Sequence, residues 1–179
     1  MVGCYRMQTS EMARQNLGFY SQTEFDLGGF PPGVIDGSME IGRACVAREH
    51  RSTHVLFLLW KGLALYVAAN RRRFLFGCSS LTSQDPVEGK AFMDQMVAKD
   101  HLHPRFTIRP QPGFECYPEG FTGNPECRVR TPPLFRIYLR HGAKVCGPPA
   151  IDREFRTIDF LILFDVDRMD RKMFATFFD

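Results

Sequence analysis

The sequence lacks the motifs that define several common enzyme classes. It contains no Walker A sequence and no G-x-G-x-x-G phosphate-binding loop. The pair Ser79-Ser80 does not lie in a G-x-S-x-G elbow, which excludes the usual serine hydrolase. His101 and His103 have no cysteine or carboxylate at metal-ligand spacing, so we expect no metal site.

Long hydrophobic runs are also lacking. The most apolar stretch, 55–69, is interrupted by Lys61 and is shorter than the roughly 20 residues that span a bilayer. The first residues show no secretory signal, and the six cysteines form no CxxC pair and lie mostly in apolar or strand-like stretches. We therefore expect a cytoplasmic protein with a reducing interior, in peripheral contact with the inner face of the membrane at most.

The chain has no strong excess of one charge. Lys and Arg outnumber Asp and Glu by 23 to 20, and a net charge of +3 is too small for a protein that binds bulk nucleic acid. Its 179 residues are 44% hydrophobic and 13% aromatic, which is typical of a folded protein and not of a disordered one. The length favours a single domain over 1–179.

Apolar patterning predicts a mixed arrangement of strands and helices, and therefore an α/β fold. A strand at 39–46, an apolar helix at 55–69 and a strand at 74–78 form a βαβ unit, with parallel strands and a helix that the sheet largely covers. Residues 19–27 partly alternate as a strand does. The other expected elements are strands at 2–7, 143–146 and 157–164, a turn or short helix at 9–17, helices at 87–99, 134–139 and 170–178, and an ordered proline-rich excursion over a site at 104–133.

A basic, hydroxyl-bearing turn joins the strand at 39–46 to the following helix. A helix N-terminus presents free N–H groups and partial positive charge, so a phosphate can bind there, and Arg48 and Arg51 can add charged hydrogen bonds. Alternatively, Ser52 or Thr53 simply caps the helix and the arginines are solvated. Arg71-Arg72-Arg73, after the same helix, is either a solvated turn or a docking patch for an acidic partner.

Two acidic groups are candidates for chemistry. Glu40, on the strand that leads into this turn, can accept a proton from an attacking amine, with Arg43 as its partner; a structural ion pair or an edge charge is the alternative. Glu24 and Asp26 lie two residues apart, which places them on one face of a strand, where they can hold a cationic group. A solvent-exposed acidic strand face is the other interpretation.

Taken in order, several blocks of the sequence resemble those of a known family, although no single block is specific enough to do so. Taken together, 19–27, 40–46, 58–64, 75–81 and 138–165 resemble the ornithine-acyl-carrier-protein N-acyltransferases. That family belongs to the GNAT superfamily, is often labelled hemolysin-like and includes N-acyl amino acid synthases. The blocks around Glu40-x-x-Arg43 and Glu24-Phe25-Asp26 also resemble the acyl-homoserine lactone synthases.

The resemblance implies a GNAT-like acyltransferase with a mixed central sheet flanked by helices. The strands 39–46 and 74–79 are expected to splay apart around the pantetheine arm of the acyl donor, with no permanently bound cofactor. The implied phosphate site is the turn formed by Arg51, Ser52, Thr53, His54 and Val55, together with Arg48. This turn has no glycine where the superfamily has R-x-x-G-x-G/A, which favours the single phosphate of an acyl-carrier-protein arm over the pyrophosphate of coenzyme A. The carrier protein is thus the expected partner, docking against Arg48, Arg51 and 71–73.

The implied reaction is transfer of a long fatty acyl chain to the α-amine of an amino acid. Ornithine is the first expected acceptor and glycine or an aromatic amino acid the next. Glu40 is the candidate base or amine-orienting group with Arg43 beside it, Glu24 and Asp26 bind the acceptor, and Phe57, Phe74 and Phe76 line the acyl pocket.

Two alternatives remain open at this point. The family has a first strand and one or two helices before the segment that matches 2–6, and we expect this chain to lack them. A non-catalytic domain that binds lipid or carrier protein is therefore an alternative of a different class. An acyl-homoserine lactone synthase-like enzyme is the alternative among enzymes.

Overall fold

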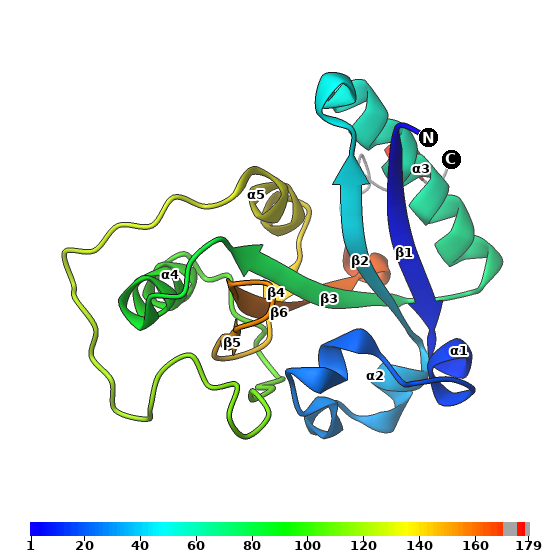
Figure 1. Cartoon of the computed structure of the whole chain (residues 1–179). Helices are drawn as coiled ribbons and strands as arrows, with labels where there is room; N and C mark the ends of the chain where they lie inside the picture. Colours follow the sequence, from blue (N-terminus) through cyan, green and yellow to red (C-terminus); the bar gives the residue numbers. More distant parts are fainter. Residues whose placement is uncertain (170–174, 178–179) are drawn as a thin grey trace.

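The computed structural model describes residues 1–169 and 175–177, which form a twisted mixed sheet with helices on both faces (Figure 1). The strands are arranged in the order β1-β2-β3-β6-β4, and β5 pairs with β6. Only β2 and β3 are parallel; every other pairing between the described strands is antiparallel. The strands are β1 (Gly3–Thr9), β2 (Ser38–Val46), β3 (Phe74–Leu81), β4 (Lys144–Val145), β5 (Ala150–Asp152) and β6 (Thr157–Asp165).

The helices begin where the sequence supplies capping groups. Thr9, Ser52 and Asp85 accept hydrogen bonds from backbone N–H groups in the first turns of α1, α3 and α4. Proline occupies a first-turn position in α2, α4 and α5, where its missing N–H costs nothing. The helices are α1 (Ser10–Arg14), α2 (Pro32–Asp36), α3 (Thr53–Ala69), α4 (Pro86–Ala98) and α5 (Pro133–Arg140), with the short 3-10 turns η1 (Tyr20–Thr23) and η2 (Leu27–Gly29) between α1 and α2.

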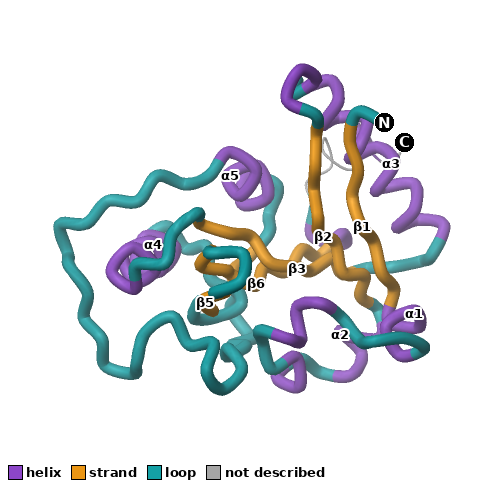
Figure 2. The backbone as a smooth tube through the Cα atoms, viewed as in Figure 1, coloured by secondary structure: helices purple, strands orange, loops and turns teal. Residues whose placement is uncertain are grey.

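β2 and β3 pair over only three residues and then diverge, as the tube in Figure 2 shows. The paired residues are Ser38–Glu40 of β2 and Phe74–Phe76 of β3. At the point of divergence Gly77 approaches the β2 backbone so closely that a Cβ atom there would lie 2.2 Å from the carbonyl oxygen of Ile41. The absence of a side chain at Gly77 is therefore required for the splay.

The two faces of the sheet bury different groups. On one face Phe19, Phe25 and Phe30 pack against Phe76 and Leu161. On the other, α4 and α5 pack against β6, and α3 packs on β2 and β3 through Leu63 and Val67. The face under η1 and η2 also carries polar residues at one end, and these form part of the site.

The expected elements correspond to most of the structure, including the parallel βαβ unit, the ordered 104–133 excursion and the helix before β4. The strand expected at 19–27 is wrong. Phe19, Phe25 and Leu27 all point into one core, so the chain folds into 3-10 turns there and does not alternate between two faces. The helix expected at 170–178 falls largely on residues outside the described part of the chain.

The expectation that α3, packed on the sheet, is largely covered is also wrong. Its outer face leaves Phe57, Leu58 and Leu65 exposed at 41%, 54% and 59%. None of the helices in the described residues is both long enough and apolar enough to cross a membrane.

Candidate active site

The splay between β2 and β3 opens into a cleft of about 310 Å³. Backbone and side chains of both strands line it, and α5 closes it on the far side through Leu134, Phe135 and Tyr138. Beyond Glu40 and Phe76 the facing strand edges no longer bond to each other. An extended chain can therefore enter between two strands of one sheet, as expected for the strands 39–46 and 74–79.

An apolar cavity of about 40 Å³ adjoins this cleft. The two share Ile41, Tyr138 and Ile162 as wall residues. The Trp60 ring stacks on Tyr138 with ring centroids 5.6 Å apart, and the hydroxyl of Tyr138 hydrogen-bonds the hydroxyl of Tyr5. The remaining wall residues are Leu63, Ala64, Leu75, Phe76, His141, Ala143, Phe164, Met169 and Phe177.

Of the three phenylalanines expected to line the acyl pocket, the structure places one in this cavity. Phe76 lies in its wall. Phe74 is buried in the core under α2, and Phe57 is partly exposed on α3 and contacts Phe177. The expectation is corrected for Phe57 and Phe74, because neither lines the apolar cavity.

A polar cavity of about 280 Å³ adjoins the same cleft on the face under η1. It shares Ile41, Gly42, Arg43, Cys78 and Ser80 with the cleft. The remaining wall residues are Tyr20, Ser21, Glu40, Asp152, Phe155, Thr157 and Asp159. The β2–β3 cleft therefore connects an apolar cavity with a charged one.

Glu40 is fully buried and its carboxylate is occupied by donors. The backbone N–H groups of Tyr20 and Ser21 donate to it at 2.9 and 2.6 Å, and the Ser21 hydroxyl donates at 2.6 Å. Arg6 completes the set with an ion pair at 3.1 Å. Glu40 thus anchors the η1 turn over the cavity, and its ion-pair partner is Arg6 and not the expected Arg43.

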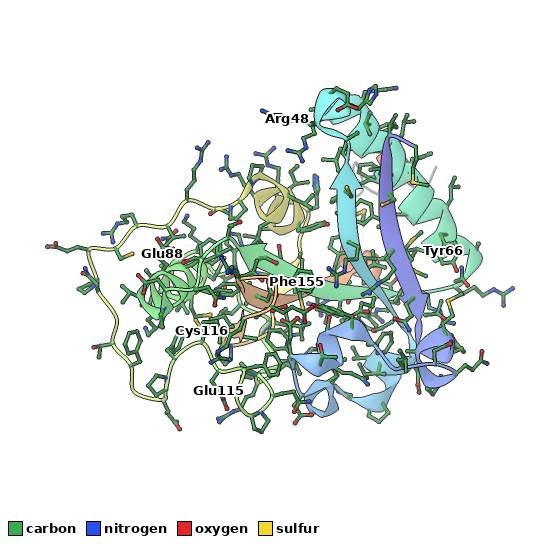
Figure 3. The ribbon with its side chains drawn as sticks, in the orientation of Figure 1. Arg48, Tyr66, Glu88, Glu115, Cys116 and Phe155 are labelled. Atoms are coloured by element: carbon green, nitrogen blue, oxygen red, sulfur yellow. The ribbon has the colours of Figure 1, made fainter. Side chains whose placement is uncertain are left out.

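Arg43 lies where the β1–β2 pairing is irregular, with a left-handed backbone (φ 53°). Its guanidinium is held between the rings of Tyr20 and Phe155, at 4.8 and 4.4 Å from their centroids. Figure 3 labels Phe155 at the centre of the view near β3. No carboxylate among the described residues forms an ion pair with Arg43, so its N–H donors can bind an anionic group in the cavity.

Glu24 and Asp26 do not share a strand face, because no strand forms there. Glu24 is buried, and its backbone carbonyl accepts a 2.7 Å hydrogen bond from the N–H of Gln111 in the 104–133 excursion. Asp26 is exposed and caps Gly28. The structure instead brings Glu24 together with Asp152 and Asp159, and one carboxylate oxygen of each lies within 4.8 Å of the others.

Burial raises the pKa of Glu24 to about 8, and the negative charge of Asp159 adds to the effect. Burial likewise raises the pKa of Asp159. Burial also raises the pKa of the Cys78 thiol, which lies between the cleft and the polar cavity. Cys78 is therefore a protonated thiol at neutral pH and a poor nucleophile.

This carboxyl pair predicts how stability depends on pH. The unfolded chain releases the Glu24 proton near pH 4.5, the ordinary glutamate pKa, whereas the folded chain retains it up to about pH 8. Stability should therefore fall as pH rises through this window, by at most about 1.4 kcal/mol per pH unit for one proton. Urea unfolding at several pH values should show a shallower slope for Glu24→Gln, whereas the exposed-site control Glu126→Gln should keep the wild-type slope. Identical slopes for all three proteins would contradict the prediction.

The residues of the expected phosphate turn lie together at the start of α3. Ser52 caps the helix by accepting from the N–H of Val55, and the Arg51 side chain bonds the carbonyl of Val46. Thr53 and His54 are exposed in the first turn. Figure 3 shows Arg48 at the end of β2 beside this turn. Helix capping is thus observed, and the phosphate site stays a prediction.

The cluster 71–73 does not belong with this turn. It follows the other end of the 17-residue α3, about 25 Å away along the helix axis. Arg72 pairs with Glu11 at 2.5 Å, and Arg73 pairs with Asp165 at 2.8 Å. These two arginines join the ends of secondary-structure elements, and docking of the carrier protein on 71–73 stays a prediction.

Sequence reasoning missed Asp152 and Asp159. Asp159 interrupts the apolar strand β6, and Asp152 ends β5, which was not anticipated. An acidic residue in an otherwise apolar strand is the signal that could have singled out Asp159. The Nδ1 atom of His103 accepts hydrogen bonds from the backbone N–H groups of Arg105 and Phe106.

Comparison with known proteins agrees with this architecture. Residues 1–61 match the family model of the acetyltransferase (GNAT) domain. No solved structure matches the chain. A parallel strand pair that splays next to a helix N-terminus, with cavities on both sides of the splay, defines a GNAT-type acyltransferase domain.

The relatives are more specific. The chain is 30% identical over 179 residues to the L-ornithine N(alpha)-acyltransferase of Brucella abortus, covering 96% of this chain and 63% of that protein. It is 31% identical over 182 residues to the enzyme of that name from Rhizobium meliloti, covering 94% and 59%. For the Rhodobacter capsulatus enzyme of that name the identity is 31% over 180 residues, covering 96% and 67%. The chain belongs to the L-ornithine N(alpha)-acyltransferase family, and it spans 63% and 59% of the length of the first two relatives.

Proposed function

We propose that the chain is an N-acyltransferase domain that moves a long fatty acyl group from acyl-carrier protein to the α-amine of ornithine. The observation that carries the proposal is the β2–β3 cleft, which connects an apolar cavity to a charged one. The fatty tail of the thioester requires apolar surroundings, and the zwitterionic amino acid requires charged ones. Both substrates must meet at one carbonyl carbon, so the two environments have to adjoin. The relatives named L-ornithine N(alpha)-acyltransferase support this acceptor.

The donor enters through the β2–β3 cleft in this proposal. Its phosphate lies at the α3 N-terminus near Arg48 and Arg51, and its acyl tail extends past Tyr138 into the apolar cavity. Backbone N–H groups at the splayed strand edges polarise the thioester carbonyl. The carrier protein supplies its 4′-phosphopantetheine arm as part of a substrate.

Direct attack by the amine is the simplest chemistry in this cleft. The amine nitrogen bonds to the carbonyl carbon, the carbon–sulfur bond breaks, and the leaving thiolate takes up the proton that the amine loses. The protonated Cys78 thiol offers no covalent route. Glu40 acts here by holding the η1 turn, because four donors already occupy its carboxylate.

The direct test combines the protein with an acyl-carrier-protein thioester and single amino acids. We expect ornithine-dependent release of the carrier thiol and formation of an N-acyl ornithine, with glycine and aromatic amino acids used less well. A lactone product would instead favour the acyl-homoserine lactone synthase alternative. Binding of carrier protein without release of thiol for any amine would favour the non-catalytic alternative.

The apolar cavity predicts a change in acyl length preference. Ala64 is buried in its wall, so Ala64→Met should fill part of it and lower kcat/KM for a C16 donor about tenfold relative to a C10 donor. The competition between the two donors measures this ratio. Ala68→Met, at an exposed position of the same helix, is the matched control and should leave the ratio unchanged. An unchanged ratio for Ala64→Met would place the acyl chain elsewhere.

The phosphate turn predicts a salt-dependent effect on donor use. Replacing both Arg48 and Arg51 by glutamine should raise KM for acyl-carrier protein several-fold at low salt, and the difference should shrink at about 0.5 M salt because screening weakens attraction between exposed charges. Arg73→Gln should leave KM unchanged and lower stability by at most about 1 kcal/mol, since its partner is Asp165. The reverse pattern would place the docking face at the other end of α3.

A further inference from the structure

Three buried carboxylates from distant parts of the chain lie together at the polar cavity: Asp152 and Asp159 in its wall, and Glu24 next to them. Glu24 follows the η1 turn, Asp152 ends β5 and Asp159 lies within β6. Their exposed fractions are 1%, 5% and 4%, and one oxygen of each lies within 4.8 Å of the others. Asp152 and Asp159 line the cavity wall directly.

These carboxylates have oxygens that the fold does not satisfy. Neither carboxyl oxygen of Glu24 nor the Oδ1 atom of Asp159 accepts a hydrogen bond from the rest of the fold, and in the free protein this buried pair retains a proton between its two carboxyls. No lysine or arginine in the described part of the chain forms an ion pair with any of the three. Buried acceptors without donors are costly, and a bound cation with N–H donors would remove that cost.

The carboxylates are also held in place by contacts that do not use the free oxygens. Asp152 accepts from the backbone N–H groups of Glu154 and Phe155 in the β5–β6 hairpin, at 2.8 and 2.9 Å. Asp159 accepts from the Thr157 hydroxyl at 3.2 Å. The backbone N–H of Gln111 donates to the backbone carbonyl of Glu24 at 2.7 Å. The group is therefore a preorganised site.

Arg43 supplies the complementary charge in the same cavity. Its guanidinium is fixed between Tyr20 and Phe155 and has no ion-pair partner among the described residues. Phe155 lies in the hairpin turn that follows Asp152, so one hairpin supplies both a carboxylate of the cavity and a ring that holds Arg43. Such a cavity suits a ligand with a carboxylate at one end and an ammonium at the other.

We infer that Glu24, Asp152 and Asp159 bind the side-chain ammonium of a diamino acid acceptor, while Arg43 binds its α-carboxylate. This inference rests on the proposed function and names the residues that select a basic acceptor over a neutral one. An ammonium that displaces the proton retained by the Glu24–Asp159 pair donates three hydrogen bonds, which match the three oxygens of Glu24 and Asp159 that accept none from the fold. A neutral side chain of the same length would leave these oxygens without donors.

The test compares L-ornithine with L-norvaline, which has the same carbon skeleton without the side-chain amine. In the full chain we expect kcat/KM to favour ornithine at least 100-fold. Asp159→Asn and Glu24→Gln should each reduce this preference at least tenfold by impairing ornithine alone. Asp94→Asn, at an exposed position on α4, is the control and should keep the wild-type preference. Equal losses for both acceptors in folded Asp159→Asn and Glu24→Gln would overturn the inference.

Calorimetry without any acyl donor separates this inference from the proposed function. Wild-type protein should bind ornithine and not norvaline, and Asp159→Asn should lose ornithine binding at least tenfold. That pattern would support the site even if no acyl transfer occurs, in which case only the proposed function fails. Tight binding of Mg²⁺ or Ca²⁺ that depends on Asp159, without ornithine binding, would overturn the inference in favour of a metal site.

Discussion

Replacing Gly77 by alanine is expected to lower the free energy of unfolding by about 3 kcal/mol. The new Cβ would lie 2.2 Å from the Ile41 carbonyl oxygen, a distance that real contacts do not reach. The atom in the way belongs to the backbone of β2, so the clash cannot be relieved by a rotamer change. β2 and β3 would have to move apart where the cleft meets both cavities, and acyl transfer should fall with stability. Denaturant unfolding measures the first effect, and thiol release measures the second.

A second glycine provides the matched control for this substitution. Gly62 lies within α3, and a Cβ atom there would have no neighbour within 4 Å. Gly62→Ala should therefore stabilise the protein by about 0.5 to 1 kcal/mol, because alanine is the better helix former. If Gly77→Ala and the wild-type protein had the same unfolding midpoint in denaturant, the close approach of β2 and β3 would not exist in solution.

Glu40→Gln is expected to cost about 3 kcal/mol of stability and to reduce acyl transfer at the same time. The carboxylate accepts from Tyr20, Ser21 and Arg6, and an amide would turn one acceptor into a donor that faces other donors. The η1 turn would lose its attachment to β2, and the wall of the polar cavity with it. Thermal or denaturant unfolding, together with KM for ornithine, reports this loss of positioning.

The outcome distinguishes two roles for Glu40. If it were the proton acceptor, Glu40→Gln would abolish turnover and leave stability within about 0.5 kcal/mol, the range of an ordinary surface change. That result would support Glu40 as the general base, the role that the sequence suggested. Asp36→Asn is the control, since its exposed ion pair with Arg14 should contribute at most about 1 kcal/mol.

Local patterns were sufficient for the elements that bury one continuous apolar face. The strand–helix–strand unit β2-α3-β3 could be predicted because strand and helix leave different spacings in the sequence and because Ser52 marks a helix start. The turns at 19–27 could not, since Phe19, Phe25 and Leu27 follow neither spacing. Their conformation depends on Glu40, which lies on a different element, the strand β2.

By itself the sequence determined the α/β class and the order of the central elements, and it singled out Glu24, Glu40 and Arg43 as candidates for the site. The tertiary structure alone decided how these residues combine: Glu40 with Arg6, Arg43 between Tyr20 and Phe155, and Glu24 with Asp152 and Asp159. The physical reason is the distance along the chain. Charges and hydrogen bonds act over a few ångströms in space, and residues far apart in the sequence meet only when β6 pairs beside β3 and the 104–133 excursion holds the η1 turn over the sheet.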